Sequence, residues 1–592
     1  MVTIGVTDTW SNKVELADVN GDGRVDILFA NGRGYASDGG PEVNSAFLNQ
    51  GSGQPFVDVG PELFGEADST RVIKARDVDG DGDLDLFVGN TWGTQSRLFL
   101  GVGAGVFEEV TSSHLPEIDA SIGDAELGDV DGDGDLDLVL AEWGPGNPAD
   151  NEGGVPRVWL NDGLGAFSEA PAGQMPEVAV RWSWELELVD VDNDYDLDIA
   201  VSCKACTGSV LLLNDGAGVF SDASEQLPHF PNSYDFEFLD IDGDGDLDAL
   251  TVNDRKPGNR EHLLIGDGTG LFIDGTERRW PNSENPGGDD NMICFLDVES
   301  DGDPDFLVAG LFGQIDRLIL NDGAGNLTLA EDAFAPADSP GTLGIAVADL
   351  DGDDRLDVVL AEGEAAEPDY VLLGVDVAPD SAPPVIDRVE SVGTSGGEGL
   401  TIRARVHDNK TPLAAHDLTS VLLRYSIDGA DDEAAMRWYG GLLWRAELPA
   451  LAPGSLLYRV CAADAAGNEA CSAEQQATIS PGAATDGDDT GDATGGETGG
   501  PASTGTTGDT GSGEDVTGGE SGAASATAGA AASAGADDDG SGCSCTAGAE
   551  ELRSADWLVV GLGFFGLGLV RRRPRFSSQS PRRALAEPSR PS

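Results

Sequence analysis

The stretch DVDGDGDLDLFVGN, residues 77–90, organises this chain, because its pattern returns along the sequence. The nine-residue pattern D-x-D-x-D-G-x-x-D, with small departures, begins at intervals of 50 to 61 residues, at Asp18, Asp77, Asp129, Asp190, Asp240, Asp297 and Asp349. A period of this length is typical of repeat architectures in which each copy is one supersecondary unit. We therefore expect seven structural units in residues 1–378.

Each copy runs into an apolar segment such as LDLFVG or LDVVLA, which is typical of a strand buried on both faces. Another strand and a glycine turn follow, as in LLLNDGAGVF at 211–220, where Asn/Asp-Gly supplies the positive φ of a hairpin. These signals predict an all-β fold, with a seven-bladed β-propeller of four-stranded blades over residues 1–378. The seventh copy lacks a fourth strand and the chain starts with an extra one near 2–6, so we expect the two ends to complete one blade.

The aspartate loops have the composition of oxygen-ligand sites. Carboxylates at positions one, three, five and nine, a backbone carbonyl at seven and glycine at six suit a hard cation, and calcium fits best. The predicted Ca2+ ligands are, repeat by repeat, Asp18, Asn20, Asp22, Arg24 and Asp26; Asp77, Asp79, Asp81, Asp83 and Asp85; Asp129, Asp131, Asp133, Asp135 and Asp137; Asp190, Asp192, Asp194, Asp196 and Asp198; Asp240, Asp242, Asp244, Asp246 and Asp248; Asp297, Glu299, Asp301, Asp303 and Asp305; Asp349, Asp351, Asp353, Arg355 and Asp357. The alternative is a set of acidic surface turns, which seven copies in register disfavour.

Three copies depart from the pattern. Tyr195 and Asp354 stand where glycine belongs, at a position that needs positive φ, and Glu299 replaces a shorter aspartate. We expect the weakest site in the sixth repeat, and a structural rather than a sensing role for the ions, since repeats of this kind are rigid.

These repeats resemble the FG-GAP/VCBS family, whose relatives include the integrin α-subunit propeller. The resemblance implies that the calcium loops share one face and that ligands meet the opposite one. Strand counting agrees, because the first and third loops of an antiparallel blade lie at one end and the second loop at the other. The candidate ligand-binding residues are aromatic, as recognition anchors often are, and comprise Trp92, Trp143, Trp182, Trp184, Tyr234 and Trp280. The alternative is that most of them pack inside or between blades.

A second domain is predicted at residues 383–480, where short strands such as LTIRARVHD resemble immunoglobulin-like or fibronectin-like sandwiches of bacterial surface proteins. Cys461 and Cys471 flank the turn DAAGN, which favours a disulfide over two free thiols. For Cys203 and Cys206 a local disulfide is favoured over a redox centre or half a zinc site.

The C-terminal residues predict a tether. Residues 481–542 have the composition of a disordered acidic stalk, and 543–573 combine Cys543, Cys545, the apolar run WLVVGLGFFGLGLV and an arginine cluster, followed by a disordered tail at 574–592. This arrangement resembles the MYXO-CTERM sorting signal of myxobacterial surface proteins, which implies processing or modification near the two cysteines. A plain transmembrane segment is the alternative.

The net charge of −75 excludes nucleic acid as an electrostatic partner. The cysteine pairs and the tether indicate export to a bacterial surface or outer membrane, with membrane contact through the C-terminal anchor. The segment at Met1 has no leader features, so we expect that the gene model begins late. We found no catalytic motif, so we expect a non-enzymatic module that binds an extracellular protein or glycan; a polysaccharide-active or other propeller enzyme, or a surface scaffold, is the alternative.

Overall fold

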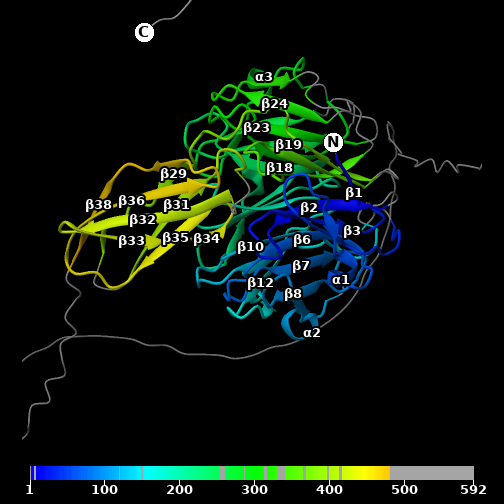
Figure 1. Cartoon of the computed structure of the whole chain (residues 1–592), viewed down its shortest axis with the longest axis horizontal. Helices are drawn as coiled ribbons and strands as arrows, with labels where there is room; N and C mark the ends of the chain where they lie inside the picture. Colours follow the sequence, from blue (N-terminus) through cyan, green and yellow to red (C-terminus); the bar gives the residue numbers. More distant parts are fainter. Residues whose placement is uncertain are drawn as a thin grey trace, which may run out of the picture. The chain divides into compact units, whose positions relative to one another are not determined.

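The computed structural model describes residues 2–480 apart from 6–8, 36, 119, 148–150, 254–259, 286, 312–315, 331–332, 334–340, 364–367, 376, 396–398 and 413–416. All of these residues lie in one compact unit, Met1–Gly491. The fold is all-β, and Figure 1 follows it through the blue-to-green repeat sheets and then the yellow strands β29 to β38. We call β1–β28 the repeat region and β29–β38 the two-sheet region.

The repeat region consists of four-stranded antiparallel sheets, one for each aspartate loop. The first four sheets contain β2 (Ser11–Ala17), β3 (Asp26–Asn31), β4 (Ser45–Leu48) and β5 (Val57–Asp58); β6 (Thr70–Arg76), β7 (Asp85–Asn90), β8 (Arg97–Gly101) and β9 (Phe107–Glu109); β10 (Ile122–Gly128), β11 (Asp137–Glu142), β12 (Arg157–Asn161) and β13 (Phe167–Glu169); β14 (Leu186–Val189), β15 (Asp198–Val201), β16 (Val210–Asn214) and β17 (Phe220–Asp222).

The remaining sheets follow the same order. They contain β18 (Ser233–Leu239), β19 (Asp248–Asn253), β20 (His262–Gly266) and β21 (Phe272–Asp274); β22 (Asp290–Leu296), β23 (Asp305–Gly310), β24 (Arg317–Asn321) and β25 (Leu327–Ala330); β26 (Thr342–Ala348), β27 (Asp357–Glu362), β28 (Asp369–Leu372) and β1 (Val2–Ile4). Short helical turns follow four of the outer strands, at α1 (Gly60–Phe64), α2 (Thr111–His114), η1 (Ser224–Gln226) and α3 (Thr276–Arg279).

The seventh sheet joins the two ends of the repeat region. Strand β1 pairs with β28 in antiparallel register, with Val2 opposite Val371 and Ile4 opposite Asp369. The first strand of each sheet contacts the first strand of the next, and β26 contacts β2, so these strands form a closed cycle. The expectation that the N-terminal strand completes the last repeat is therefore met.

A recurring asparagine at the end of the third strand ties each such sheet to its neighbour. The side chain of Asn161 donates to Val78 O at 2.8 Å, and that of Asn214 donates to Val130 O at 2.8 Å. Across the junction of the chain ends, Asn49 donates to Leu350 O at 2.8 Å. The Leu-Asn turn sequence thus supplies both a hairpin and a bond between repeats.

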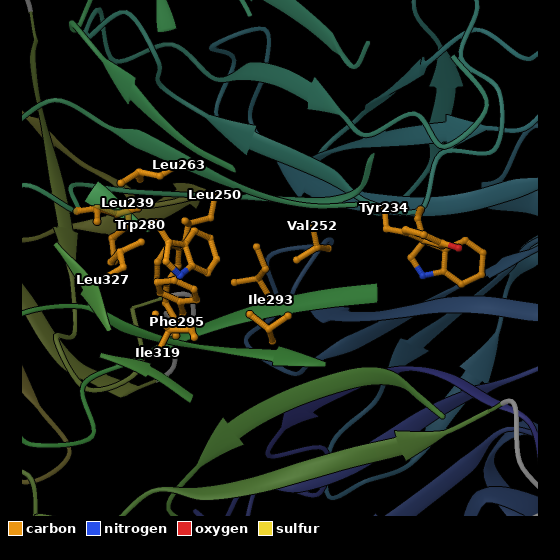
Figure 2. Close-up of a cluster of buried hydrophobic side chains, with 14 of the residues drawn as sticks. Tyr234, Leu239, Leu250, Val252, Leu263, Trp280, Ile293, Phe295, Ile319 and Leu327 are labelled. Atoms are coloured by element: carbon orange, nitrogen blue, oxygen red, sulfur yellow. The ribbon is translucent and has the colours of Figure 1, made fainter. Parts of the chain in front are cut away.

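The apolar second strands are buried on both faces, as their composition predicts. Strands β7, β11 and β19 are buried at every residue. Figure 2 shows one of the resulting clusters, in which Trp280 packs near Leu239, Leu250 and Leu327. Burial of such side chains at about 25 cal/mol per Å2 stabilises the repeats.

The two-sheet region has one four-stranded and one larger sheet. The first contains β29 (Val385–Val389), β31 (Leu400–His407), β35 (Leu443–Leu448) and β34 (Arg437–Gly440), and the second β30 (Thr394–Ser395), β38 (Gln475–Ile479), β36 (Gly454–Asp464), β32 (Leu418–Ile427), β33 (Ala430–Ala435) and β37 (Glu469–Cys471). Residues of both sheets, including Ile402 and Leu456, share one core. The likeness to immunoglobulin-like modules stays a prediction.

Among the residues that the structure describes, no helix has the length and apolar character needed to span a bilayer. The predicted stalk, the apolar run, Cys543 and Cys545 lie outside the described residues.

Candidate metal centres

The aspartate loops join the first and second strands of each repeat sheet. In the loop between β6 and β7, carboxylate oxygens of Asp77, Asp79 and Asp85 lie within 4.8 Å of one another. Gly80 N and Gly82 N donate to Asp77 Oδ1 and Oδ2 at 2.8 and 3.0 Å. These backbone bonds curl the chain around the acidic side chains.

The same grouping recurs in the third, fourth and fifth repeats. The clustered carboxylates are Asp129, Asp131 and Asp137; Asp190, Asp192 and Asp194; and Asp240, Asp242 and Asp248. A loop that wraps several carboxylate oxygens at this separation has the donor set of a hard divalent cation.

The sixth loop position adopts the left-handed conformation even where glycine is absent. Its φ is 95° at Gly82, 68° at Tyr195 and 63° at Asp354. A non-glycine residue there costs about 1–2 kcal/mol. Tyr195 gains packing in return, since its ring lies beneath the Arg403 guanidinium at 5.5 Å from the ring centroid.

The ninth position is buried and begins the second strand. Asp85 accepts Val78 N at 2.8 Å and Gly101 N at 2.7 Å. Burial raises the pKa of Asp85 to about 7 and that of Asp137 to about 8, and backbone donors only partly oppose this. Several carboxylates in such a site cannot all ionise cheaply without a compensating cation.

A further feature shows that the loops fit a cation. One oxygen of the third-position carboxylate is buried without a hydrogen-bond partner in three repeats, at Asp192 Oδ1, Asp242 Oδ1 and Asp351 Oδ1. Buried polar atoms are normally satisfied, and an unsatisfied oxygen at the same position of the fourth, fifth and seventh loops is what a site for a cation would show. The residues present therefore fit Ca2+, which would supply structural cross-linking of each loop.

Basic side chains of the two-sheet region reach several of these loops. Arg445 Nη1 bonds Asp129 Oδ2, and Arg405 Nη2 lies 3.4 Å from Asp190 Oδ2. Arg403 Nη1 lies 2.8 Å from Asp196 Oδ1. The position-one carboxylates of the third and fourth loops are therefore each paired with an arginine guanidinium, and these ion pairs were not predicted from the sequence.

The sequence of β31 contains a pattern that places two of these arginines on one face, but it does not say what they contact. In LTIRARVHD, Ile402, Ala404 and Val406 alternate with Arg403 and Arg405. The apolar set is buried in the core of the two-sheet region, and alternation therefore directs both arginines to the other face of β31.

The predicted ligand-binding aromatics separate into two groups. Trp143, Trp184, Tyr234 and Trp280 are buried, with exposed fractions of 1, 5, 5 and 1%. Trp184 stacks on Trp143 at a centroid distance of 5.9 Å and meets Tyr234 edge to face at 6.2 Å. The alternative, that such residues pack inside the repeats, describes these four.

Trp92 and Trp182 are only partly buried, and each has positive φ, 60° and 59°. Lys204 Nζ lies 4.2 Å from the ring centroids of both Trp182 and Tyr234. The structure contains disulfides between Cys203 and Cys206 and between Cys461 and Cys471.

Comparisons with known proteins agree with the repeat pattern. A family model described as an FG-GAP-like repeat matches residues 18–88, 77–140 and 297–360. Cartilage acidic protein 1 of Xenopus tropicalis is 31% identical over 146 residues, which cover 23% of this chain and 22% of the relative. The Mus musculus protein of the same name is 30% identical over 135 residues, covering 22% and 20%. The chain thus spans about a fifth of the length of these relatives.

Among solved structures, the crystal structure of an engineered protein matches 20% of this chain and 24% of its own, at 17% identity and a TM-score of 0.14, which carries no argument about the fold. The family-model match does carry one, because each matched segment contains an aspartate loop and the strand that follows it. The chain contains FG-GAP-like repeats in three places.

Proposed function

We propose that the repeat region is a calcium-loaded seven-bladed β-propeller, exported to a cell surface, that binds an extracellular protein or glycan without catalysing a reaction. The closed cycle of first strands supports the propeller, and the orphaned third-position oxygens support calcium. The FG-GAP-like repeats, and the similarity to proteins named cartilage acidic protein 1, support a binding or adhesive role.

The observation that carries the binding proposal is a preorganised aromatic and basic surface around Trp182. Strand β15 begins at Asp198, the ninth position of an aspartate loop, and ends at Val201, so the loop with Lys204 lies at the opposite end. Lys204 N donates to Trp182 O, and Ala205 N donates to Arg181 O, each at 3.2 Å. The Cys203–Cys206 disulfide closes this loop, so the surface loses little conformational entropy on binding.

This surface favours an acidic ligand. Arg181, Trp182 and Lys204 bring two cations and an indole together in a chain whose net charge is −75. Carboxylated glycans and acidic protein segments complement this local surface. The two disulfides support an oxidising, extracytoplasmic compartment. Anchoring through Cys543 or Cys545 and contact with a membrane belong to the same proposal.

The test is binding of the purified full-length chain to a panel of acidic and neutral glycans and matrix proteins, in calcium and in chelator. We expect saturable binding of acidic ligands, lost in Trp182→Ala and weakened at least tenfold in Lys204→Gln, with unchanged melting temperatures. Tyr425→Ala, which alters a partly exposed aromatic residue of β32, is the matched control. Binding that survives both variants would overturn the site, and an absence of any binding would favour a scaffold.

A further inference from the structure

The first strands of the repeat sheets carry an uneven ring of charges. Side chains two residues apart on a strand share a face. Such pairs are charged in the first five sheets and uncharged in the last two. The charged pairs are Lys13 and Glu15, Lys74 and Arg76, Asp124 and Glu126, Glu185 and Glu187, and Asp235 and Glu237. The uncharged pairs are Met292 and Cys294, and Gly344 and Ala346.

A recurring irregularity positions these residues. The pairing between first and second strands shifts register immediately before Lys13, Asp124, Asp235 and Met292. Such bulges re-aim the side chains that follow them. Because the first strands form a closed cycle, the re-aimed side chains meet inside it.

Acidic groups outnumber basic ones in this interior. Lys13 Nζ lies 2.7 Å from both Asp124 Oδ1 and Glu185 Oε2. Lys74 pairs with Glu126, and Arg76 Nη1 lies 2.8 Å from Glu15 Oε1. These contacts engage each of the three cations.

Glu237 points to a ligand, because it is a carboxylate of this ring that lines a cavity and has an unsatisfied oxygen. It is 5% exposed, and its Oε2 has no hydrogen-bond partner. With Glu187 it lines a cavity of about 480 Å3. Burial raises the pKa of both carboxyls well above the usual range, and repulsion adds to it, from Glu126 at Glu187 and from Glu187 at Glu237. An unsatisfied carboxylate that faces a cavity carries a desolvation cost that a cationic ligand would offset.

Charged groups held in ion pairs also line the cavity, among them Lys13, Lys74, Arg76 and Arg405, and apolar side chains complete its wall. Met292 and Val347 line it from the sixth and seventh sheets, and Trp438, Leu442 and Trp444 line it from the hairpin of β34 and β35. Its volume is that of a small-molecule site, since such sites range from about 300 to 1,000 Å3, and far exceeds the needs of a bare ion.

We infer that this cavity, which we call the channel chamber, binds a small organic cation, an amine or quaternary ammonium with an apolar body, whose charge lies against Glu187 and Glu237. The apolar body would contact the side of the chamber formed by Met292 and Val347, and the hairpin tryptophans would cover it. Aromatic and acidic side chains together recognise alkylated ammonium groups. This inference does not rest on the surface around Trp182, but Asp18 and Asp190 of the aspartate loops also line the chamber.

The test uses the full-length chain saturated with calcium, so that the aspartate loops do not contribute. Isothermal titration with n-hexyltrimethylammonium is compared with n-hexanol, which lacks the charge, and with hexanoate, which reverses it. We expect one equivalent of the cation to bind and to raise the melting temperature of the protein. The other two probes should bind at least tenfold more weakly.

Variants then locate the site. Glu187→Gln and Glu237→Gln should each weaken the cation at least tenfold, while Glu108→Gln, at an exposed position of β9, leaves it unchanged. Glu237→Asp, which keeps the charge, should retain part of the affinity for the cation. It serves as a control for loss of binding through misfolding. The proposal is overturned if n-hexanol binds as tightly as the cation, or if both glutamine variants bind the cation as tightly as the native chain. It is also overturned if an excess of divalent ion displaces the amine and the binding of that ion is lost in Glu237→Gln.

Discussion

Replacing Arg445 with glutamine tests whether the two-sheet region and calcium neutralise the same carboxylate. The Arg445 guanidinium bonds Asp129 Oδ2, and the two side chains are 8% and 0% exposed. Removing one partner of a buried ion pair leaves an uncompensated charge and costs about 3–5 kcal/mol. In chelator we expect Arg445→Gln to lose that amount of unfolding free energy.

Calcium should reduce this loss. A divalent cation in the third loop would give Asp129 another positive partner, so the remaining cost would be that of the lost charged hydrogen bond, about 2 kcal/mol. Denaturant unfolding in chelator and in saturating calcium, followed by tryptophan fluorescence, measures both values.

The matched control is Arg424→Gln. Arg424 lies 3.1 Å from Glu469 in the two-sheet region, and the side chains are 38% and 53% exposed. A pair this exposed is worth about 0–1 kcal/mol, with or without calcium. The reasoning is refuted if the two variants lose equal stability, or if calcium leaves the loss in Arg445→Gln unchanged.

Three other substitutions test separate parts of the fold. Asp354 is exposed with φ at 63°, so Asp354→Gly should raise the unfolding free energy by up to about 1–2 kcal/mol in chemical denaturation, while Asp354→Val lowers it because a β-branched residue tolerates positive φ less well than aspartate, and equal effects would contradict the assigned strain. The Cys461–Cys471 disulfide spans 10 residues, and its replacement by two serines should cost about 3 kcal/mol by chemical denaturation, whereas an unchanged unfolding free energy would contradict a stabilising role for this bond. His262 is stacked on Phe230, and burial lowers its pKa to about 4. The folded state therefore binds this proton less readily than the unfolded chain, so stability falls as the pH drops from about 6.5 towards 4, and His262→Gln should show a shallower slope over that range than the native chain.

Local pattern was sufficient for the repeats. The aspartate spacing and the apolar segments predicted the loops and the buried second strands, because loop conformation, strand burial and hairpin turns depend on residues close in sequence. The pairing of β1 with β28 is long-range, and it was predicted by counting strands in the repeats. Both cysteine pairs are short-range as well, with separations of 3 and 10 residues, and were also predicted.

The aromatic side chains show where local pattern fails. Trp182 and Trp184 are two residues apart and were placed together as ligand contacts, yet Trp184 is 5% exposed whereas Trp182 lies partly at the surface. Burial depends on whether another repeat covers the ring, here Trp143, Tyr35 and Tyr234 around Trp184. No single segment contains that information.

The sequence by itself determined the all-β class, the number and register of the acidic loops and the chemistry of their donors. Only the tertiary structure decided which loops meet an arginine and which charges face the channel chamber, since Lys13 lies 172 residues from Glu185 and Arg445 lies 316 from Asp129. Electrostatic energy depends on separation in space and on burial, and both are fixed for such pairs only when the first strands close their cycle and the two-sheet region packs against it.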